Sequence, residues 1–207
     1  MGELRHMLRD DDVNHEEQKQ ILELGMKFRA DRFYHRPFEG PQGVAVIFDK
    51  PSTRTRSSFS IGVAELGGYP LVIDKSGSQL GRGEPVADTA EVLTRMAYGI
   101  VWRTFEQSRV EQMARVATVP VVNALTDEFH PCQVLADFLT LAQFKGGVDN
   151  LENLKIAYVG DAANHTCLRA RSPAWMCVSQ GRTATCRTRR SSRMPRPSPR
   201  PRVAASW

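Results

Sequence analysis

The sequence lacks long apolar runs, and most of it has almost no cysteine. No stretch approaches the roughly 18 consecutive apolar residues that a membrane-spanning helix needs. Residues 1–12, MGELRHMLRDDD, are charged and are not typical of a secretory signal. Cys132 is the only cysteine before residue 166, and no cysteine pair has the spacing of a zinc site. These absences argue against a membrane-spanning or disulfide-stabilised protein and predict a cytoplasmic one.

Acidic residues are missing from residues 166–207, which carry ten arginines and no lysine. The preceding residues hold 18 basic and 23 acidic groups, so the formal net charge of +5 comes from this tail and is poor support for nucleic-acid binding. The Arg/Pro/Ser-rich tail has no hydrophobic periodicity, and its composition predicts disorder. We interpret this tail as an out-of-frame translation. Synonymous codons can be chosen for residues 173–187 so that a reading frame that starts one base earlier encodes a strand-like segment, DVRVAGP. The alternative is a genuine basic tail that binds an acidic partner.

Short apolar runs alternate with helical patterns along residues 1–165. Strands are expected at 43–49, 69–74, 99–103, 119–125 and 154–160, and helices after Asn14 and at 57–68, 85–99, 105–117 and 131–144. The strands are apolar on both faces, which is typical of a parallel sheet covered by helices on both sides. The sequence therefore predicts an α/β fold, and ligands of such folds bind beyond the carboxyl ends of the strands.

The segment Ser52–Arg56, STRTR, directly follows the first expected strand. A helix that begins here would present free N–H groups and the positive end of its dipole, which together bind anions. Serine and threonine hydroxyls add donors, and an arginine matches the geometry of phosphate oxygens. Because Arg54 and Arg56 are two residues apart, one is expected to contact the ligand and the other to form a structural ion pair. The alternative is an ordinary serine-capped helix with solvated arginines.

Three further segments carry candidate polar groups. Arg103 ends an apolar strand, and it is either a ligand contact or a surface arginine. His130 precedes a helix that is expected to start at Pro131. Its side chain is suited to donate a hydrogen bond to a carbonyl oxygen, and Gln133 is suited to bind an amide. The alternative is that His130 only caps the helix and that Gln133 is an exposed surface residue. Cys132 is expected to pack as a small hydrophobe. The loop SGSQLGRGE matches neither a dinucleotide fingerprint nor a P-loop.

The segments FDKPSTRTRSSF, SGSQLGRGE, VWRTF and FHPCQVLADF together resemble the aspartate/ornithine carbamoyltransferase family, in the family's order. The FHPCQ and SQLG forms favour the ornithine-using branch over the aspartate-using relatives. The resemblance covers residues 3–164 and implies transfer of the carbamoyl group from carbamoyl phosphate to L-ornithine, which gives L-citrulline and phosphate in arginine biosynthesis. It implies a homotrimer, and it implies no metal or organic cofactor.

The resemblance also implies roles for individual residues. The phosphate of carbamoyl phosphate would be held by Ser52, Thr53, Arg54 and Thr55. Arg103 and His130 would lie on the carbonyl oxygen as the catalytic pair, and Gln133 near the carbamoyl nitrogen. Gln79 would lie in a loop that reaches a neighbouring subunit's site. Donors placed in advance at the carbonyl oxygen stabilise the negative charge that grows there.

The resemblance divides the chain into a carbamoyl phosphate-binding domain at 1–150, the first strand and loop of an incomplete ornithine-binding domain at 151–165, and the tail at 166–207. The resemblance makes Asn164 the candidate contact for ornithine. The family places two asparagines after this strand, the second of which contacts ornithine; Asn164 matches one of them, whereas the next residue here is His165. The SMG and HCLP segments of the family's second domain are absent from the sequence. The 207 residues are therefore expected to bind carbamoyl phosphate without completing the reaction. Two alternatives are an aspartate-using relative and a non-catalytic anion-binding module with a basic interaction tail.

Overall fold

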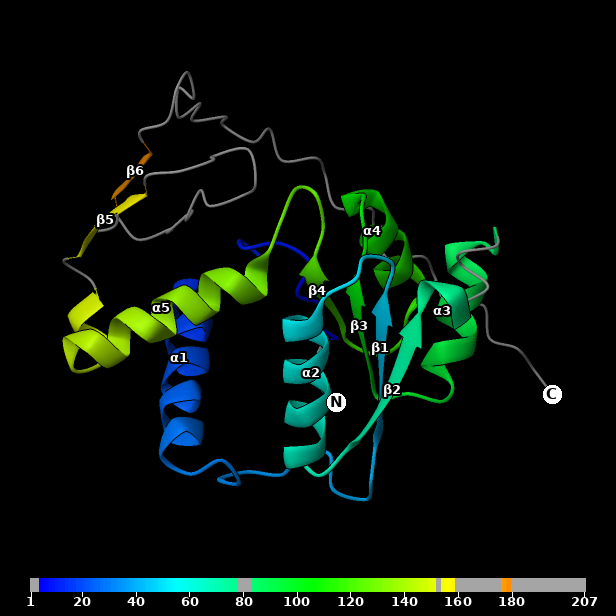
Figure 1. Cartoon of the computed structure of the whole chain (residues 1–207), viewed down its shortest axis with the longest axis horizontal. Helices are drawn as coiled ribbons and strands as arrows, with labels where there is room; N and C mark the ends of the chain where they lie inside the picture. Colours follow the sequence, from blue (N-terminus) through cyan, green and yellow to red (C-terminus); the bar gives the residue numbers. More distant parts are fainter. Residues whose placement is uncertain (1–3, 78–82, 152–153, 159–175, 180–207) are drawn as a thin grey trace.

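A computed structural model of the chain describes residues 4–77, 83–151, 154–158 and 176–179. Helices and strands alternate along most of it, as the sequence predicts (Figure 1). The elements in order are α1 (His15–Ala30), β1 (Gly43–Phe48), α2 (Thr53–Glu65), β2 (Tyr69–Asp74), η1 (Lys75–Gly77), α3 (Val86–Thr94), β3 (Gly99–Arg103), α4 (Gln107–Val116), β4 (Val121–Leu125), α5 (Pro131–Lys145), η3 (Asp149–Leu151), β5 (Lys155–Tyr158) and β6 (Met176–Ser179).

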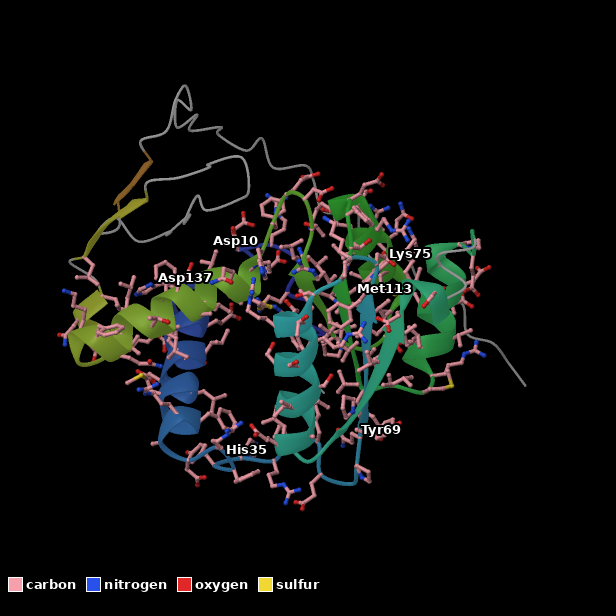
Figure 2. The ribbon with its side chains drawn as sticks, in the orientation of Figure 1. Asp10, His35, Tyr69, Lys75, Met113 and Asp137 are labelled. Atoms are coloured by element: carbon pink, nitrogen blue, oxygen red, sulfur yellow. The ribbon has the colours of Figure 1, made fainter. Side chains whose placement is uncertain are left out.

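The central sheet has four parallel strands in the order β2-β1-β3-β4. Figure 1 shows α2 on one side of this sheet and α3 on the other, with α1 and α5 crossing beside α2. The expected α/β fold with a parallel sheet covered on both faces is confirmed. In Figure 2, Lys75 lies at the end of the sheet where the strands finish, and Tyr69 lies at the opposite end.

The apolar runs form strands because both of their faces are buried. Along β1, Val46 and Phe48 belong to the core cluster beneath α2, whereas Ala45 and Ile47 belong to the cluster beneath α3 and α4. A smaller core joins α1 to α5 through Leu22 and its neighbours. Burial on both faces explains why these strands read as continuous apolar runs and not as alternating ones.

The helix ends follow the sequence with small differences. Asn14 and Glu17 form the expected capping box of α1, in which each side chain accepts a hydrogen bond from the other residue's backbone N–H. Helix α2 begins at Thr53, earlier than its apolar spacing indicated. Pro85, expected as the first helical residue, is instead the N-cap of α3, and α3 ends at Thr94. The chain leaves this helix early because Tyr98 N–H already bonds to Gly43 O of the sheet (2.8 Å).

An N-terminal segment that the sequence did not predict as a strand closes the outer edge of β4. Met7 forms a parallel bridge with Val122: its N–H donates to Val121 O (2.9 Å), and its carbonyl accepts from Asn123 N–H (2.8 Å). The His6 Nδ1 accepts a hydrogen bond from the Val121 N–H (3.1 Å). The edge of β4 is therefore paired, which removes unsatisfied backbone groups from it.

The hydrogen bond to His6 makes the stability of this edge depend on pH. Burial lowers the pKa of His6 below its ordinary value of 6.5, against the opposing effect of the Asp12 carboxylate. Because the neutral imidazole is favoured in the folded state, its contribution is present above the unfolded-state pKa and is lost as the pH falls through the folded-state pKa. We expect the free energy of unfolding to fall between pH 7.5 and pH 5, as measured by urea unfolding at each pH. The His6→Gln variant should lose part of this dependence, and a pH profile identical to that of the unchanged protein would contradict the assignment.

Strand β5 lies where the sequence predicts a strand, and it pairs in parallel with β6. Strand β6 falls within residues 166–207, for which no strand was expected. An unpaired β5 would leave backbone N–H and C=O groups without partners, and the short MCVS segment supplies them. The other residues of 166–207 lie outside the described part of the chain. Among the described residues, no helix has the length and apolar character to cross a membrane.

Candidate functional site

Three chain segments with candidate polar residues converge at the carboxyl edge of the sheet. Ser52 follows β1, Arg103 ends β3, and His130 follows β4 after a short loop. Strands β1, β3 and β4 are neighbours, and their register places Phe48 opposite Arg103 and Arg103 opposite Leu125. The topology therefore brings these predicted site residues to the same edge of one sheet.

Ser52 is the N-cap of α2 and fixes the first turn of this helix. Its Oγ accepts a hydrogen bond from Thr55 N–H (3.3 Å) and donates to Thr55 Oγ1 (2.9 Å). The simpler expectation of a serine-capped helix is thus correct, but it does not oppose the anion-site interpretation. The first turn of a helix retains other free N–H groups and the positive end of the dipole. Hydroxyl groups and free N–H donors therefore lie together where β1 ends.

The two arginines of the STRTR segment have different surroundings. Arg56 forms an ion pair with Asp74 at the end of β2, and its guanidinium lies over the Phe48 ring, 5.4 Å from the centroid. Arg56 is therefore the structural member of the pair that the spacing predicted. Arg54 is exposed, and none of the ion pairs found among the described residues includes it.

Arg103 lies near Arg54 in an environment that favours a bound anion. Burial, and then the positive charge of Arg54, lower the pKa of Arg103. The Arg103 Nε is buried without a hydrogen-bond partner among the described residues, so Arg103 is not a freely solvated surface arginine. A dianion between these side chains would satisfy the donors and relieve the repulsion between the two cations.

A buried polar network fixes the loop that leads to His130. The Asn123 Nδ2 donates to the carbonyl oxygen of Leu8 (2.9 Å), and its Oδ1 accepts from Leu125 N–H (2.9 Å). Thr126 Oγ1 donates to Gln107 Oε1 (2.8 Å). Asn123, Gln107 and Thr126 are all almost fully buried. Because buried polar groups are costly without partners, this network holds the start of the β4–α5 loop in one conformation.

His130 and Gln133 lie at the start of α5. His130 occupies the N-cap position, but its side chain makes no capping hydrogen bond, so the expectation of a capping histidine holds only for its position. Gln133 is exposed, and its Nε2 donates to Asp137 Oδ1 (2.8 Å). Cys132 lies between them; its Sγ donates to Asn123 O (3.5 Å), and burial raises the pKa of its thiol to about 12. A thiol with so high a pKa is a poor nucleophile, which agrees with its expected packing role.

Several residues at this edge were not identified from the sequence. The buried Asp49 contacts the residues on both sides of Arg103. The Lys50 ammonium pairs with Asp127 and lies 4.5 Å from the Phe105 ring centroid. Their only sequence signal is a charged pair immediately after an apolar strand, which does not reveal partners more than 50 residues away. Two candidates, Gln79 and Asn164, lie outside the described residues.

Comparison with known proteins agrees with this geometry. Residues 5–143 match the carbamoyl-P binding domain of the aspartate/ornithine carbamoyltransferases. The chain is 80% identical over 163 residues to the ornithine carbamoyltransferase of Bifidobacterium longum, covering 79% of this chain and 51% of that protein. It is 56% identical over 161 residues to the ornithine carbamoyltransferase of Mycolicibacterium paratuberculosis, covering 78% and 51%. The chain thus spans about half the length of the curated relatives it matches.

Solved structures give the same result. The ornithine carbamoyltransferase of Burkholderia thailandensis superposes with a TM-score of 0.75 at 40% identity, covering 85% of this chain and 61% of that one. The enzyme of Pyrococcus furiosus superposes with a TM-score of 0.70 at 43% identity, covering 76% and 50%. The family match, which includes the STRTR turn, Arg103 and His130, therefore shows that this chain belongs to the aspartate/ornithine carbamoyltransferase family.

Proposed function

We propose that this chain is the carbamoyl phosphate-binding part of an enzyme that transfers the carbamoyl group to L-ornithine, giving L-citrulline and phosphate. One structural observation carries the proposal: Arg103 is half-buried, with its Nε inaccessible to solvent, close to the like-charged Arg54 at the edge where Ser52 begins α2. Two cations beside a helix N-terminus are favourable when a dianion lies between them. The relatives named ornithine carbamoyltransferase support the choice of ornithine as the acceptor.

The proposed roles follow the chemistry of carbamoyl transfer. The phosphate would be held by Ser52, Thr53, Arg54 and Thr55. The ornithine amine attacks the carbamoyl carbon, so a C–N bond forms, the C–O bond to phosphate breaks, and the amine loses a proton. Negative charge grows on the carbonyl oxygen and then on the departing phosphate. Arg103 and His130 would donate to that oxygen, and their placement before the reaction lowers the barrier.

Gln133 would orient the carbamoyl amide. Its Nε2 already donates to Asp137 Oδ1 (2.8 Å), which directs the amide group of Gln133. The Gln133 Oε1 is then the acceptor suited to the N–H groups of the carbamoyl nitrogen. No metal or organic cofactor takes part in this scheme.

We extend the proposal to the assembly, following the family resemblance. Residues 1–150 would form the carbamoyl phosphate-binding domain, and residues 151–165 would begin the ornithine-binding domain. The protein would form a cytoplasmic homotrimer that serves arginine biosynthesis, and Gln79 would reach the site of a neighbouring subunit in it. The exposed Tyr69 and Leu71 on the edge strand β2 support a subunit contact there. Sedimentation equilibrium tests this point, and a monomer at every concentration would contradict it.

Ligand binding tests the proposed function directly. Phosphonoacetamide replaces the bridging oxygen of carbamoyl phosphate with a methylene group and is therefore stable in solution. We expect it to bind the 207-residue chain and to raise its unfolding temperature, because a ligand that binds only the folded state stabilises it. Methylphosphonate, which lacks the amide, should bind more weakly. A protein that binds neither compound in calorimetry would contradict the proposal.

The same chain should form no citrulline from carbamoyl phosphate and ornithine. Alignment of two reactants supplies much of the rate acceleration in such reactions. The segments that the family resemblance assigns to ornithine binding, SMG and HCLP, do not occur in these 207 residues. A colorimetric citrulline assay checks this expectation, and measurable product from the purified chain would contradict it.

A further inference from the structure

Asp49 is a buried carboxylate that none of the proposed substrate contacts includes. It directly follows β1, and its side chain is only 6% exposed. Its Oδ2 accepts hydrogen bonds from Trp102 Nε1 (3.1 Å) and from Thr104 Oγ1 (2.5 Å). A carboxylate this buried requires strong donors, so these contacts constrain both donor residues.

Both donors are the immediate neighbours of Arg103. In addition, the Asp49 N–H donates to the Arg103 carbonyl oxygen (2.9 Å). Asp49 therefore contacts residues 102, 103 and 104 in succession. These contacts involve the backbone of Arg103 and the side chains of its two neighbours. Among the described residues, the ion pair found for Asp49 is with Arg109 and not with the Arg103 guanidinium.

The two faces of the sheet explain this arrangement. Trp102 belongs to the core cluster beneath α3 and α4, whereas Val101 belongs to the cluster beneath α2. Because successive strand residues point to opposite faces, Arg103 shares the side of Val101, on which α2 and Arg54 lie. Asp49 holds the strand from the other face and leaves the guanidinium available for a ligand.

The charge of Asp49 is balanced on its own face of the sheet. The Arg109 guanidinium lies 3.7 Å from Asp49 Oδ2 and stacks over the Trp102 ring, 5.2 Å from its centroid. This partner offsets the negative charge, so that Asp49 does not neutralise the cationic site across the sheet. Its contribution to the site is then mainly geometric.

Arg103 needs such support for two reasons. The pairing of β3 with β4 changes register between Trp102 and Arg103, so the regular ladder is interrupted at this point. The positive charge of Arg54 also repels the guanidinium of Arg103. Without a restraint on residues 102–104, both effects would let Arg103 move away from the turn at Ser52.

We propose that Asp49 is the positioning residue that holds Arg103 at a fixed distance from the phosphate-binding turn. Asp49 lies three residues before Ser52, so one short segment anchors both halves of the site. The phosphoryl and carbonyl groups of carbamoyl phosphate have a fixed separation, and the site must match it. This inference rests on the proposed function. It adds Asp49 as a determinant of the selectivity of the site for the carbamoyl group of carbamoyl phosphate.

The test compares two probes that differ only in the amide, phosphonoacetamide and methylphosphonate, by calorimetry on the 207-residue chain. In the Asp49→Ala variant we expect the preference for phosphonoacetamide to fall about tenfold, because small displacements of a positioned group have large effects. The affinity for methylphosphonate should change less than about threefold, since the helix N-terminus at Ser52 is intact. The Asp49→Asn variant keeps an acceptor oxygen and should retain most of the preference.

Two further variants separate positioning from loss of stability. Thr104→Val removes one of the two donors to Asp49 and should lower the preference in the same direction but less, which provides a test even if Asp49→Ala does not fold. Leu93→Ala makes a cavity in the core beneath α3 and should lower the unfolding temperature without changing the preference.

The outcomes are distinct. The positioning role would be overturned if Asp49→Ala and Thr104→Val lowered the affinities for the two probes by the same factor. It would also be overturned if neither variant changed the preference for phosphonoacetamide. A loss of preference in Leu93→Ala equal to that in Asp49→Ala would also overturn it. If the unsubstituted protein binds neither probe, the proposed function is contradicted, and the positioning role of Asp49 with it. This outcome is distinguishable because it is measured before any substitution is made.

Discussion

Replacing Arg54 with methionine is expected to weaken phosphonoacetamide binding by about 100-fold, as a charge-assisted contact to a phosphonate contributes several kcal/mol. The same variant should unfold at an unchanged or higher temperature. Arg54 is exposed and takes part in none of the ion pairs of the described residues, and its positive charge opposes that of Arg103. Loss of binding without loss of stability distinguishes a ligand contact from a structural one, and calorimetry with thermal unfolding measures both.

Arg56→Met is the matched control, because it removes the same charge two residues away. Arg56 pairs with Asp74 and stacks on Phe48, so its loss should lower the unfolding temperature. Its effect on the affinity should stay below about fivefold, since its positive charge is already engaged by Asp74. If Arg56→Met weakened binding as much as Arg54→Met, the assignment of roles within the STRTR segment would be wrong.

Replacing Asn123 with leucine is expected to lower the free energy of unfolding by about 3–5 kcal/mol, because each buried polar group left without a partner costs roughly 1–3 kcal/mol. The Asn123 side chain is fully buried and bonds to the carbonyl oxygen of Leu8 and to the Leu125 N–H. Leucine has a similar size but offers neither donor nor acceptor. Urea unfolding measures the loss.

Asn150→Leu provides the comparison for this variant. Asn150 is exposed, and its Nδ2 donates to the Lys145 carbonyl oxygen (2.7 Å). Its replacement should cost less than about 1 kcal/mol, because solvent replaces an exposed partner. Similar losses in the two variants would show that the network around Asn123 is not a special source of stability.

Local patterns predicted the elements of the fold well. The strands from β1 to β4 are short apolar runs that a polar residue ends or directly follows, and Asn14 with Glu17 marks the start of α1. Because these strands alternate with helices along the chain, the sequence predicts a parallel sheet. The carboxyl edge of such a sheet is where a ligand site is expected. Ser52, Arg103 and His130 could be placed at this edge because Arg103 ends its strand and the other two follow theirs within a few residues.

Contacts between distant segments could not be predicted in the same way. The bond between Trp102 and Asp49 joins residues 53 apart, and the one between Val121 and His6 joins residues 115 apart. Periodicity reports only which face of an element is apolar, not which element covers it. Nothing in the spacing of Asn123 distinguishes a buried hub from a surface asparagine, since both are single polar residues in an apolar run.

The order in which the ribosome makes this chain is not the order in which its sheet can be completed. Met7 leaves the ribosome long before Val122, yet it has no strand to join until β4 has been made and has docked on β3. Contacts so distant in sequence form slowly, because a long loop must close first. This early segment is thus among the last to settle, and the loop that carries His130, tied to Leu8 through Asn123, must wait for it.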